Sequence, residues 1–307
     1  MKLRFATSLL TLVLASLASF LAVEFAPGDR AELLLGGASA GISSETLARF
    51  RERHGLDQPV ALRYLAWLRS LWEQRLGVSL KTGRPVLEEF RVRIPVSAAL
   101  AAGALTVGSL AGLAFGLLCV RFQDRWPDHG IRLLASACQS APVFLIGLFA
   151  LYLLSFRFGW FPLYGAAGGG LVLPIGVLGG TLACSLSRVV RNALLQACHQ
   201  EYFLAALAKG LSFGQALLRH AVPNIGTLVI TYLGMRMASL LGGVVLIESV
   251  FSLPGMGGYI LEAILSRDYP VIQAYLLFAC TVVLVANFSV DVLARRLDPR
   301  AAQFQMV

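Results

Sequence analysis

Long apolar blocks separated by short polar connections run along almost the whole chain. Six stretches are predominantly apolar: residues 6–25, 96–120, 132–156, 171–187, 225–249 and 271–293. An apolar helix of about 20 residues spans the roughly 30 Å hydrocarbon core of a bilayer. The ten-residue alternation typical of transmembrane β-strands does not occur in these stretches. The pattern therefore predicts an all-α polytopic membrane protein with six transmembrane helices.

The first stretch has a second interpretation. Lys2 and Arg4 precede the apolar run and small residues follow it, which is also the order in a secretory signal peptide. The run from Phe5 to Phe25 is longer than a typical signal-peptide core, and it contains no strong cleavage site. We predict that residues 1–26 are a retained transmembrane helix, with a signal peptide as the alternative.

Composition and charge exclude a soluble protein and set the orientation. Of the 307 residues, 57% are hydrophobic and 14% charged, whereas globular chains carry about 25% charged residues. Short cytoplasmic connections are enriched in Lys and Arg. With both termini in the cytoplasm, the short outer connections hold only Arg157 and Arg267. The cytoplasmic pieces then hold Lys2, Arg4, Arg121, Arg125, Arg132, Arg188, Arg191, Lys209, Arg219, Arg295, Arg296 and Arg300. The net charge of +9 thus reflects membrane topology, and it does not indicate nucleic-acid binding.

Residues 27–93 form a long polar segment that this topology places outside the membrane. The run SSETLARFRERHG has a serine before its first turn and a glycine at its end, which predicts a helix. The run VALRYLAWLRSLWEQRLG carries leucines at 62, 65, 68 and 71, which predicts an amphipathic helix lying on the bilayer. We therefore divide the chain into helix 1–26, outer segment 27–93 and a core of five transmembrane helices at 94–307.

The stretch EYFLAALAKGLSFGQALLRH at 201–220 is too polar and too broken by glycine to cross a bilayer. Helix formers predict a first helix that Gly210 ends, and Ser212 with Gln215 predicts a capping box that starts a second helix. The second helix is expected to end near His220, before Pro223. Phe203, Leu204, Leu207 and Leu211 give the first helix an apolar face, which requires a protein surface to pack against. That surface is either another protein or the underside of the chain's own helix bundle.

The EYFLAALAKG run resembles the coupling loop of permease subunits of binding-protein-dependent ABC importers. Other segments resemble the oligopeptide, dipeptide and nickel branch of that family: GLDQP, RYLAWL, LGVSLKTGRPV, AKGLSFGQALLRHAVPN, ESVFSLPGMGGYI, SRDYPVIQAY and VDVLARRLDPR. The resemblance covers nearly the whole chain and implies a type I importer permease fold. Family members usually have arginines where Leu204 and Leu207 stand, and we expect this change to make the chain selective for its own partner.

The resemblance also implies the partners and the function of the loop at 188–223. In the family this loop docks on a cytoplasmic ATPase and couples its movement to the transmembrane helices. The implied assembly has a second homologous permease, two ATPase subunits that hold ATP and Mg²⁺, and an extracytoplasmic solute-binding protein, in the cytoplasmic (inner) membrane of a bacterium. The coupling residues implied here are Glu201, Tyr202, Ala205, Ala206, Lys209 and Gly210.

The sequence contains no catalytic or cofactor motif, so we expect no enzyme activity, bound cofactor or metal in this chain. It lacks HExxH and the GxxxxGK[ST] phosphate loop. All four histidines (His54, His129, His199 and His220) are predicted outside the spans, and the five cysteines form no CxxC pair.

Arg236 lies in the middle of the fifth predicted span, where a charged residue is costly and points to function. We predict that Arg236 and Ser239 face a translocation pathway, where the arginine attracts carboxylate-bearing cargo. The alternative is a structural ion pair with a neighbouring subunit. Glu248, about three turns further along, is too distant to pair with Arg236 and is expected at the membrane interface beside the FSLPGMGG turn.

Two functional interpretations remain open. The first is an ATP-driven importer permease for di- or oligopeptides, with nickel or a metal chelate as the alternative cargo. The second is a self-sufficient channel or secondary transporter. A secondary transporter often contains inverted repeats with broken helices, and no convincing internal repeat is present. The pattern of the coupling loop favours the importer.

Overall fold

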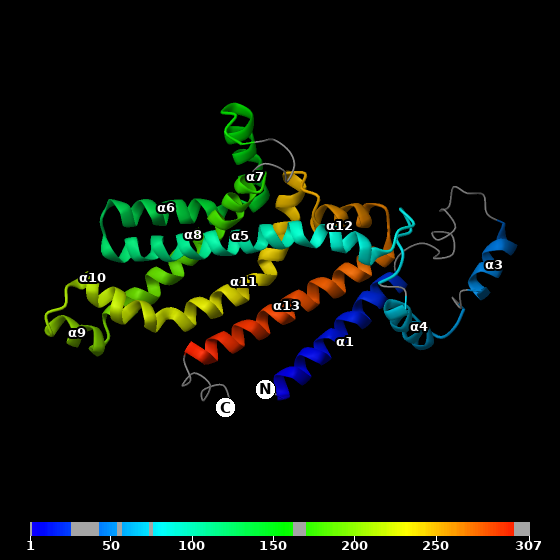
Figure 1. The fold of residues 1–307 in the computed structure, drawn as a ribbon, viewed down its shortest axis with the longest axis horizontal. Helices are drawn as coiled ribbons and strands as arrows, with labels where there is room; N and C mark the ends of the chain where they lie inside the picture. The colour runs from blue at the N-terminus through cyan, green and yellow to red at the C-terminus, as the bar shows by residue number, and fades with distance from the viewer. Residues whose placement is uncertain (1, 26–42, 54–56, 74–75, 162–169, 298–307) are drawn as a thin grey trace. The chain divides into compact units, whose positions relative to one another are not determined.

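The computed structural model describes residues 2–25, 43–53, 57–73, 76–161 and 170–297. These residues are helical apart from turns and one isolated β-bridge between Val78 and Pro85, which confirms the all-α fold class. The chain divides into two compact units, residues 1–92 with 259–282 and residues 93–258 with 283–307 (Figure 1). Parts of the predicted outer segment (26–42, 54–56 and 74–75) and of the connection 157–170 lie outside the described residues.

The helices have the following bounds. The first unit contains α1 (Lys2–Glu24), α3 (Ser44–Arg53) and α4 (Val60–Glu73). The second contains α6 (Trp126–Ser140), α7 (Val143–Ala150), the π-helix η2 (Leu151–Arg157), α8 (Val172–Cys198), α9 (Glu201–Ala208), α10 (Phe213–Ala216), the π-helix η4 (Leu217–Ala221) and α11 (Val222–Val250). Residues of both units contribute to α5 (Val86–Arg121), α12 (Met256–Leu265) and α13 (Tyr269–Leu297).

In the first unit, α4 packs against α1 through one side and leaves its leucines exposed. The Phe20 ring meets Tyr64 edge-on at 5.4 Å between centroids and lies 5.6 Å from Trp67. The hydroxyls of Ser16 and Tyr64 are hydrogen bonded at 2.6 Å. The leucines of the predicted apolar face at 62, 65 and 68 are exposed. Both helices predicted within residues 43–73 are therefore present, and the aromatic side of α4 is the one that the chain itself covers.

An acidic side chain joins two loops of the first unit that are far apart in sequence. Asp268 is buried and accepts three hydrogen bonds, from the Ser79 hydroxyl at 2.5 Å and from the backbone N–H groups of Leu80 at 3.1 Å and Lys81 at 3.4 Å. Lys81 also pairs with Glu262 at 2.6 Å. The LGVSLKTGRPV and SRDYP segments thus form one structure, because the carboxylate satisfies the backbone donors of the loop.

The described residues contain four helices of membrane-spanning length, or five spans if a bent pair counts as one, and the count of six stays a prediction. Four of the described helices are long and apolar enough to cross a bilayer: Val86–Arg121, Val172–Cys198, Phe213–Val250 and Tyr269–Ala294. In α1, only the shorter stretch Leu10–Glu24 is apolar by the same measure. The predicted third span, 132–156, corresponds to two helical segments, Trp126–Ser140 and Val143–Arg157, which together are apolar enough for a span but are bent by 107° where they meet. Ala141 is extended, as expected for the residue before a proline, and Pro142 begins the next helix.

In the second unit, a row of glycines lets α5 approach α8 closely. A Cβ atom at Gly108 would lie 2.7 Å from the Leu182 side chain, and one at Gly112 would lie 2.8 Å from Leu186. Gly116 repeats the contact one turn further on, against Val190. Small residues at every fourth position allow helix backbones to approach each other in membranes. The spacing of glycines at 108, 112 and 116 would have predicted this close packing from the sequence alone.

A bulky residue in this row is expected to destabilise the unit. Gly112→Val would place its side chain against Leu186, which is fully buried, and overpacking of this kind costs about 1–3 kcal/mol. Gly180→Val is the matched control on α8, because a Cβ at Gly180 meets no atom within 4 Å. Thermal unfolding in detergent should show a lower midpoint for Gly112→Val than for Gly180→Val. Equal midpoints would contradict the close approach of α5 and α8.

A buried ion pair fixes the start of α6 to α8, two helices that lie side by side (Figure 1). Arg191 donates to both oxygens of the Asp128 carboxylate, at 2.8 Å from Nε and 2.7 Å from Nη2. The Asp124 backbone N–H also donates to this carboxylate, at 3.2 Å. Asp128 is fully buried and the Arg191 side chain is 15% exposed. The pair closes the turn between α5 and α6 onto the part of α8 that leads into the loop at 199–212.

Candidate functional site

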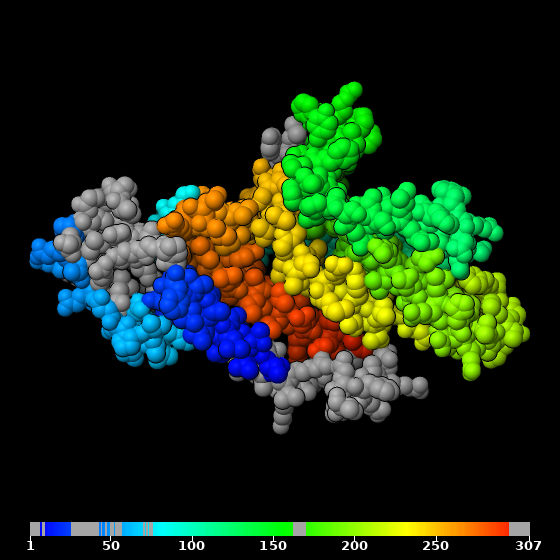
Figure 2. Space-filling view, turned by 180° about the vertical axis from the view of Figure 1, so that it is seen from behind, coloured from blue at the N-terminus to red at the C-terminus, as the bar shows by residue number. Residues whose placement is uncertain are grey.

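The loop at 199–212 has the local structure that its sequence predicts. Helix α9 ends at Ala208, and Gly210 adopts a φ of +87°, a conformation that glycine accepts without steric cost. The capping box is present: the Gln215 backbone N–H donates to Ser212 Oγ at 3.4 Å, and the Ser212 N–H donates to Gln215 Oε1 at 3.1 Å. Figure 2 shows part of the segment 200–220 (yellow-green) at the surface.

The predicted apolar face of α9 is divided between the interior and the surface. Phe203 is buried with Ala206, and the Phe203 ring meets Phe213 edge-on at 5.7 Å. Leu207 and Leu211 pack against the same core. Leu204 lies on the other side and is 55% exposed. The chain's own helices therefore take most of the predicted face, and Leu204 remains accessible to another protein.

The coupling residues implied by the resemblance lie on α9 and in the turn that follows it, in different environments. Glu201, Tyr202, Ala205, Lys209 and Gly210 are exposed, whereas Ala206 is buried. We define the α9 surface as Tyr202, Leu204 and Ala205. Leu218 on η4 is also exposed, at 60%, and sequence reasoning did not single it out. An exposed apolar group of this kind is informative because it is held in place by buried neighbours on the same short helices.

The second helix of the loop does not end before Pro223, contrary to the prediction. The chain passes from α10 through the π-helix η4 into α11, so that Phe213–Val250 is one helical segment of 38 residues. Pro223 lies in the first turn of α11, where its missing N–H is tolerated. The Asn224 side chain donates to the His220 carbonyl at 3.0 Å. The loop is therefore joined directly to the helix that carries Arg236.

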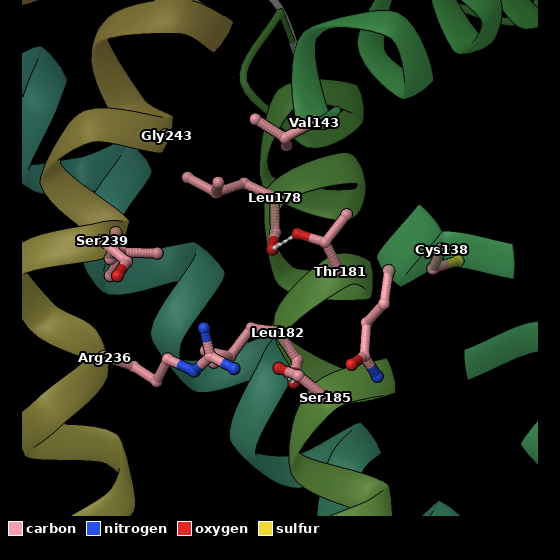
Figure 3. A pocket seen from close by; sticks show the side chains of 11 residues that line it. Cys138, Val143, Leu178, Thr181, Leu182, Ser185, Arg236, Ser239 and Gly243 are labelled. Atoms are coloured by element: carbon pink, nitrogen blue, oxygen red, sulfur yellow. Dashed lines mark hydrogen bonds between the residues drawn. The ribbon is translucent and has the colours of Figure 1, made fainter. Parts of the chain in front are cut away.

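A pocket lies between α11, α8 and the junction of α6 with α7 (Figure 3). Its empty volume is about 700 Å³, a figure that includes its open mouth. Arg236 is the only charged residue among those that line it. The others are Cys138, Gln139, Val143, Leu178, Thr181, Leu182, Ser185, Ser239, Leu240 and Gly243. The two predicted pathway residues, Arg236 and Ser239, thus line the same pocket.

Arg236 extends from α11 towards α8 (Figure 3). Its Nε donates to the Tyr232 hydroxyl at 2.9 Å, and its guanidinium carbon lies 5.2 Å from the centre of the Tyr232 ring. No ion pair to a carboxylate is found for Arg236 within the described part of the chain. Tyr232 therefore orients the guanidinium without neutralising its charge.

Glu248 lies beside the FSLPGMGG turn, as predicted, and is completely buried within the chain, while its place at a membrane interface stays a prediction. Its Oε2 accepts the Gly257 backbone N–H at 2.6 Å, and a Cβ at Gly257 would lie 2.8 Å from that oxygen. The neighbouring Met256 N–H donates to Ser97 Oγ at 2.8 Å. Gly255 and Gly257 are thus required for the turn to close over the carboxylate. Among the described residues, no group of three or more His, Cys, Asp or Glu side chains could hold a metal ion.

Comparison with known proteins gives two overlapping family matches. Residues 86–303 match the family described as binding-protein-dependent transport system inner membrane component. Residues 1–101 match the N-terminal family of the same kind of membrane component. Together the two matches cover the chain from residue 1 to residue 303.

Individual relatives are similar over nearly their full length. The chain is 34% identical over 306 residues to a putative peptide transport system permease protein of Brucella abortus (strain 2308), covering 97% of this chain and 96% of that protein. It is 31% identical over 290 residues to a glutathione transport system permease protein of Salmonella choleraesuis (strain SC-B67), covering 94% of each. The chain therefore belongs to the inner-membrane permeases of binding-protein-dependent ABC importers, in the peptide, dipeptide and nickel branch.

Proposed function

We propose that this multi-pass permease imports di- or oligopeptides together with a second homologous permease, two ATPase subunits and an extracytoplasmic solute-binding protein. Both termini and the α9 surface would face the cytoplasm. The observation that carries the proposal is the α9 surface itself: Tyr202 and Leu204 are exposed on a helix anchored by the buried Phe203. Helix α9 directly precedes the 38-residue helix 213–250. Movement of a protein bound to the α9 surface would therefore pass to the membrane core.

The chain's part in the cycle is to transmit movement. Its sequence has no phosphate loop for ATP, so the partner ATPase subunits would bind and hydrolyse ATP with Mg²⁺. Glu201, Tyr202, Ala205, Lys209 and Gly210 are accessible to such a partner. Ala206 would act indirectly, by packing α9 onto the chain's own core. Opening and closing of the ATPase pair would move α9, and α10 with η4 would pass that movement to α11.

Two observations support peptides as the cargo. The relatives described above are named for peptide and glutathione transport, which favours peptides over nickel or a metal chelate. Arg236 and Ser239 line a pocket with one positive charge, which suits a molecule that carries a carboxylate. We propose that these two residues lie on the translocation pathway. A self-sufficient channel or secondary transporter is the less supported alternative, because it gives the exposed α9 surface no function.

Mass spectrometry of the chain purified from native membranes in mild detergent tests the assembly. We expect two ATPase subunits and one homologous permease for each copy of the chain, with a solute-binding protein captured when peptide is present. Purification of the chain alone as a stable homo-oligomer would overturn the proposal and favour the self-sufficient channel.

A further inference from the structure

The pocket that contains Arg236 presents more than a positive charge. We infer that it is a subsite, built within this one subunit, for the C-terminal end of a peptide: Arg236 donates to the terminal carboxylate, and the hydroxyl oxygens of Thr181 and Ser185 accept N–H groups of the last amide bonds. The inference rests on the proposed function and specifies what its cargo must carry.

The position of Arg236 suits a carboxylate that enters from outside the chain. The Tyr232 hydroxyl occupies Nε at 2.9 Å, which leaves the two terminal nitrogens of the guanidinium free to donate in parallel. The residues that line the pocket include no acid that would compete for them. Figure 3 shows the guanidinium directed away from the α11 backbone, towards Leu182 and Ser185 of α8. The site therefore has an oriented donor whose usual partner is missing from the pocket.

The two hydroxyls on α8 are restricted to the role of acceptors. Thr181 Oγ1 donates its proton to the Leu178 carbonyl at 2.8 Å, and Ser185 Oγ donates to the Leu182 carbonyl at 2.9 Å. A hydroxyl has one proton and two lone pairs. Since each proton is used within the helix, the lone pairs remain for a donor in the pocket. A backbone N–H group supplies that donor, and the side chain of the cargo need not take part.

The remaining lining is compatible with many peptides. Val143, Leu178, Leu182 and Leu240 are apolar and provide no directional contact. The Gln139 amide oxygen accepts from Arg188 at 3.4 Å, and this leaves the Gln139 NH₂ group as a further donor. The polar groups of the pocket thus match a carboxylate and its adjacent amide, which all linear peptides share, rather than one particular sequence.

Transport by the complete importer in proteoliposomes tests the inference with one peptide in two forms, free acid and C-terminal amide. Arg236→Gln should lower kcat/KM for the free acid about 10- to 100-fold, the usual loss for a hydrogen bond to a charged group. The kcat/KM for the amidated peptide should change by less than about threefold, which is less than the loss of one hydrogen bond to a charged group would cause. The same binding protein is present in each sample, so the change in the acid-to-amide ratio reports on the permease. Met235→Gln is the control, because Met235 is 67% exposed on the same helix and does not line the pocket.

The hydroxyls are tested by a different pair of peptides. The double substitution Thr181→Val with Ser185→Ala should lower transport of both the acid and the amide about 3- to 10-fold, as expected for neutral hydrogen bonds. It should not lower transport of a peptide whose last two amide nitrogens are both methylated, because neither hydroxyl then has an N–H donor to accept. An equal loss for acid and amide in Arg236→Gln, or no loss in either variant, would overturn the inference.

Cys138 provides a measurement on the unmodified importer, in case Arg236→Gln does not assemble. This cysteine lines the pocket and is partly exposed, so a small methanethiosulfonate reagent should label it, and Cys138→Ser identifies its signal. The free-acid peptide should protect Cys138 from labelling, and the amide should not. Equal protection by both peptides would contradict the subsite. An importer that transports no peptide in either form would instead contradict the proposed function.

Discussion

Asp128→Ala is expected to destabilise the protein by about 3–5 kcal/mol, because it leaves Arg191 buried without its partner. The wild-type carboxylate receives two hydrogen bonds from Arg191, at 2.8 and 2.7 Å, and is fully buried. Removing one member of such a pair costs much more than the pair contributes, since the desolvated charge stays behind. The change should loosen the start of α6 from α8 and reduce the yield of folded protein.

Denaturant unfolding in detergent, followed by tryptophan fluorescence, would measure this loss. The double substitution Asp128→Leu with Arg191→Met should recover most of it, because it removes both charges together. Glu73→Ala is the control at an exposed ion pair, where Arg69 and Glu73 lie 2.7 Å apart with side chains 79% and 56% exposed. We expect no measurable change there. A double variant as unstable as Asp128→Ala would show that the volume of these side chains matters more than their charge.

Leu204→Glu is expected to weaken the association of the ATPase subunits about 30- to 1,000-fold, the range for a central interface residue. Leu204 is 55% exposed on α9, so folding should be unaffected. Phe203→Ala should instead destabilise the folded permease, since Phe203 is 1% exposed and packs against Phe213. Loss of a buried aromatic ring costs about 3–5 kcal/mol.

Two readouts separate these effects: the amount of ATPase that co-purifies and the unfolding midpoint of the permease. Leu204→Glu should lower the amount of co-purified ATPase and leave the unfolding midpoint unchanged. Phe203→Ala should lower the unfolding midpoint. Retention of the ATPase by Leu204→Glu would contradict docking through the α9 surface.

Local structure was largely predictable from the sequence. Gly210 is suited to a turn, and Ser212 with Gln215 three positions later is suited to a capping box; the turn and the capping box in the structure agree with that pattern. The apolar blocks likewise predicted the positions of the long helices. Propensity and capping act between residues within one or two turns of each other, so they are visible in a short window of sequence.

Tertiary partners were not predictable from single residues. Asp128 and Arg191 are 63 positions apart and meet only because α6 packs on α8. Glu248 was expected beside the FSLPGMGG turn, but the sequence did not show that the glycines of this turn bring a backbone N–H to its buried carboxylate. Pro223 was expected to end a helix, and instead it lies in the first turn of one. For Asp128 and Glu248, contacts with another segment of the chain determined the environment of the side chain.

The π-helical turn at Leu217–Ala221 sets an angular relation between two distant parts of the molecule. Each residue of an α-helix turns about 100° around the axis and rises 1.5 Å along it. The 38 residues from Phe213 to Val250 therefore form a helix about 57 Å long. A π-helical turn holds an extra residue compared with an α-helical one. Removing one residue from 217–221 would convert this turn to an α-helical one and leave the α9 surface at nearly the same angle to Arg236, whereas removing one residue from the α-helical stretch 222–235 would turn it by about 100°. The angle around the helix axis between the α9 surface and Arg236, and not only the contacts of each, is therefore a property that the sequence must preserve.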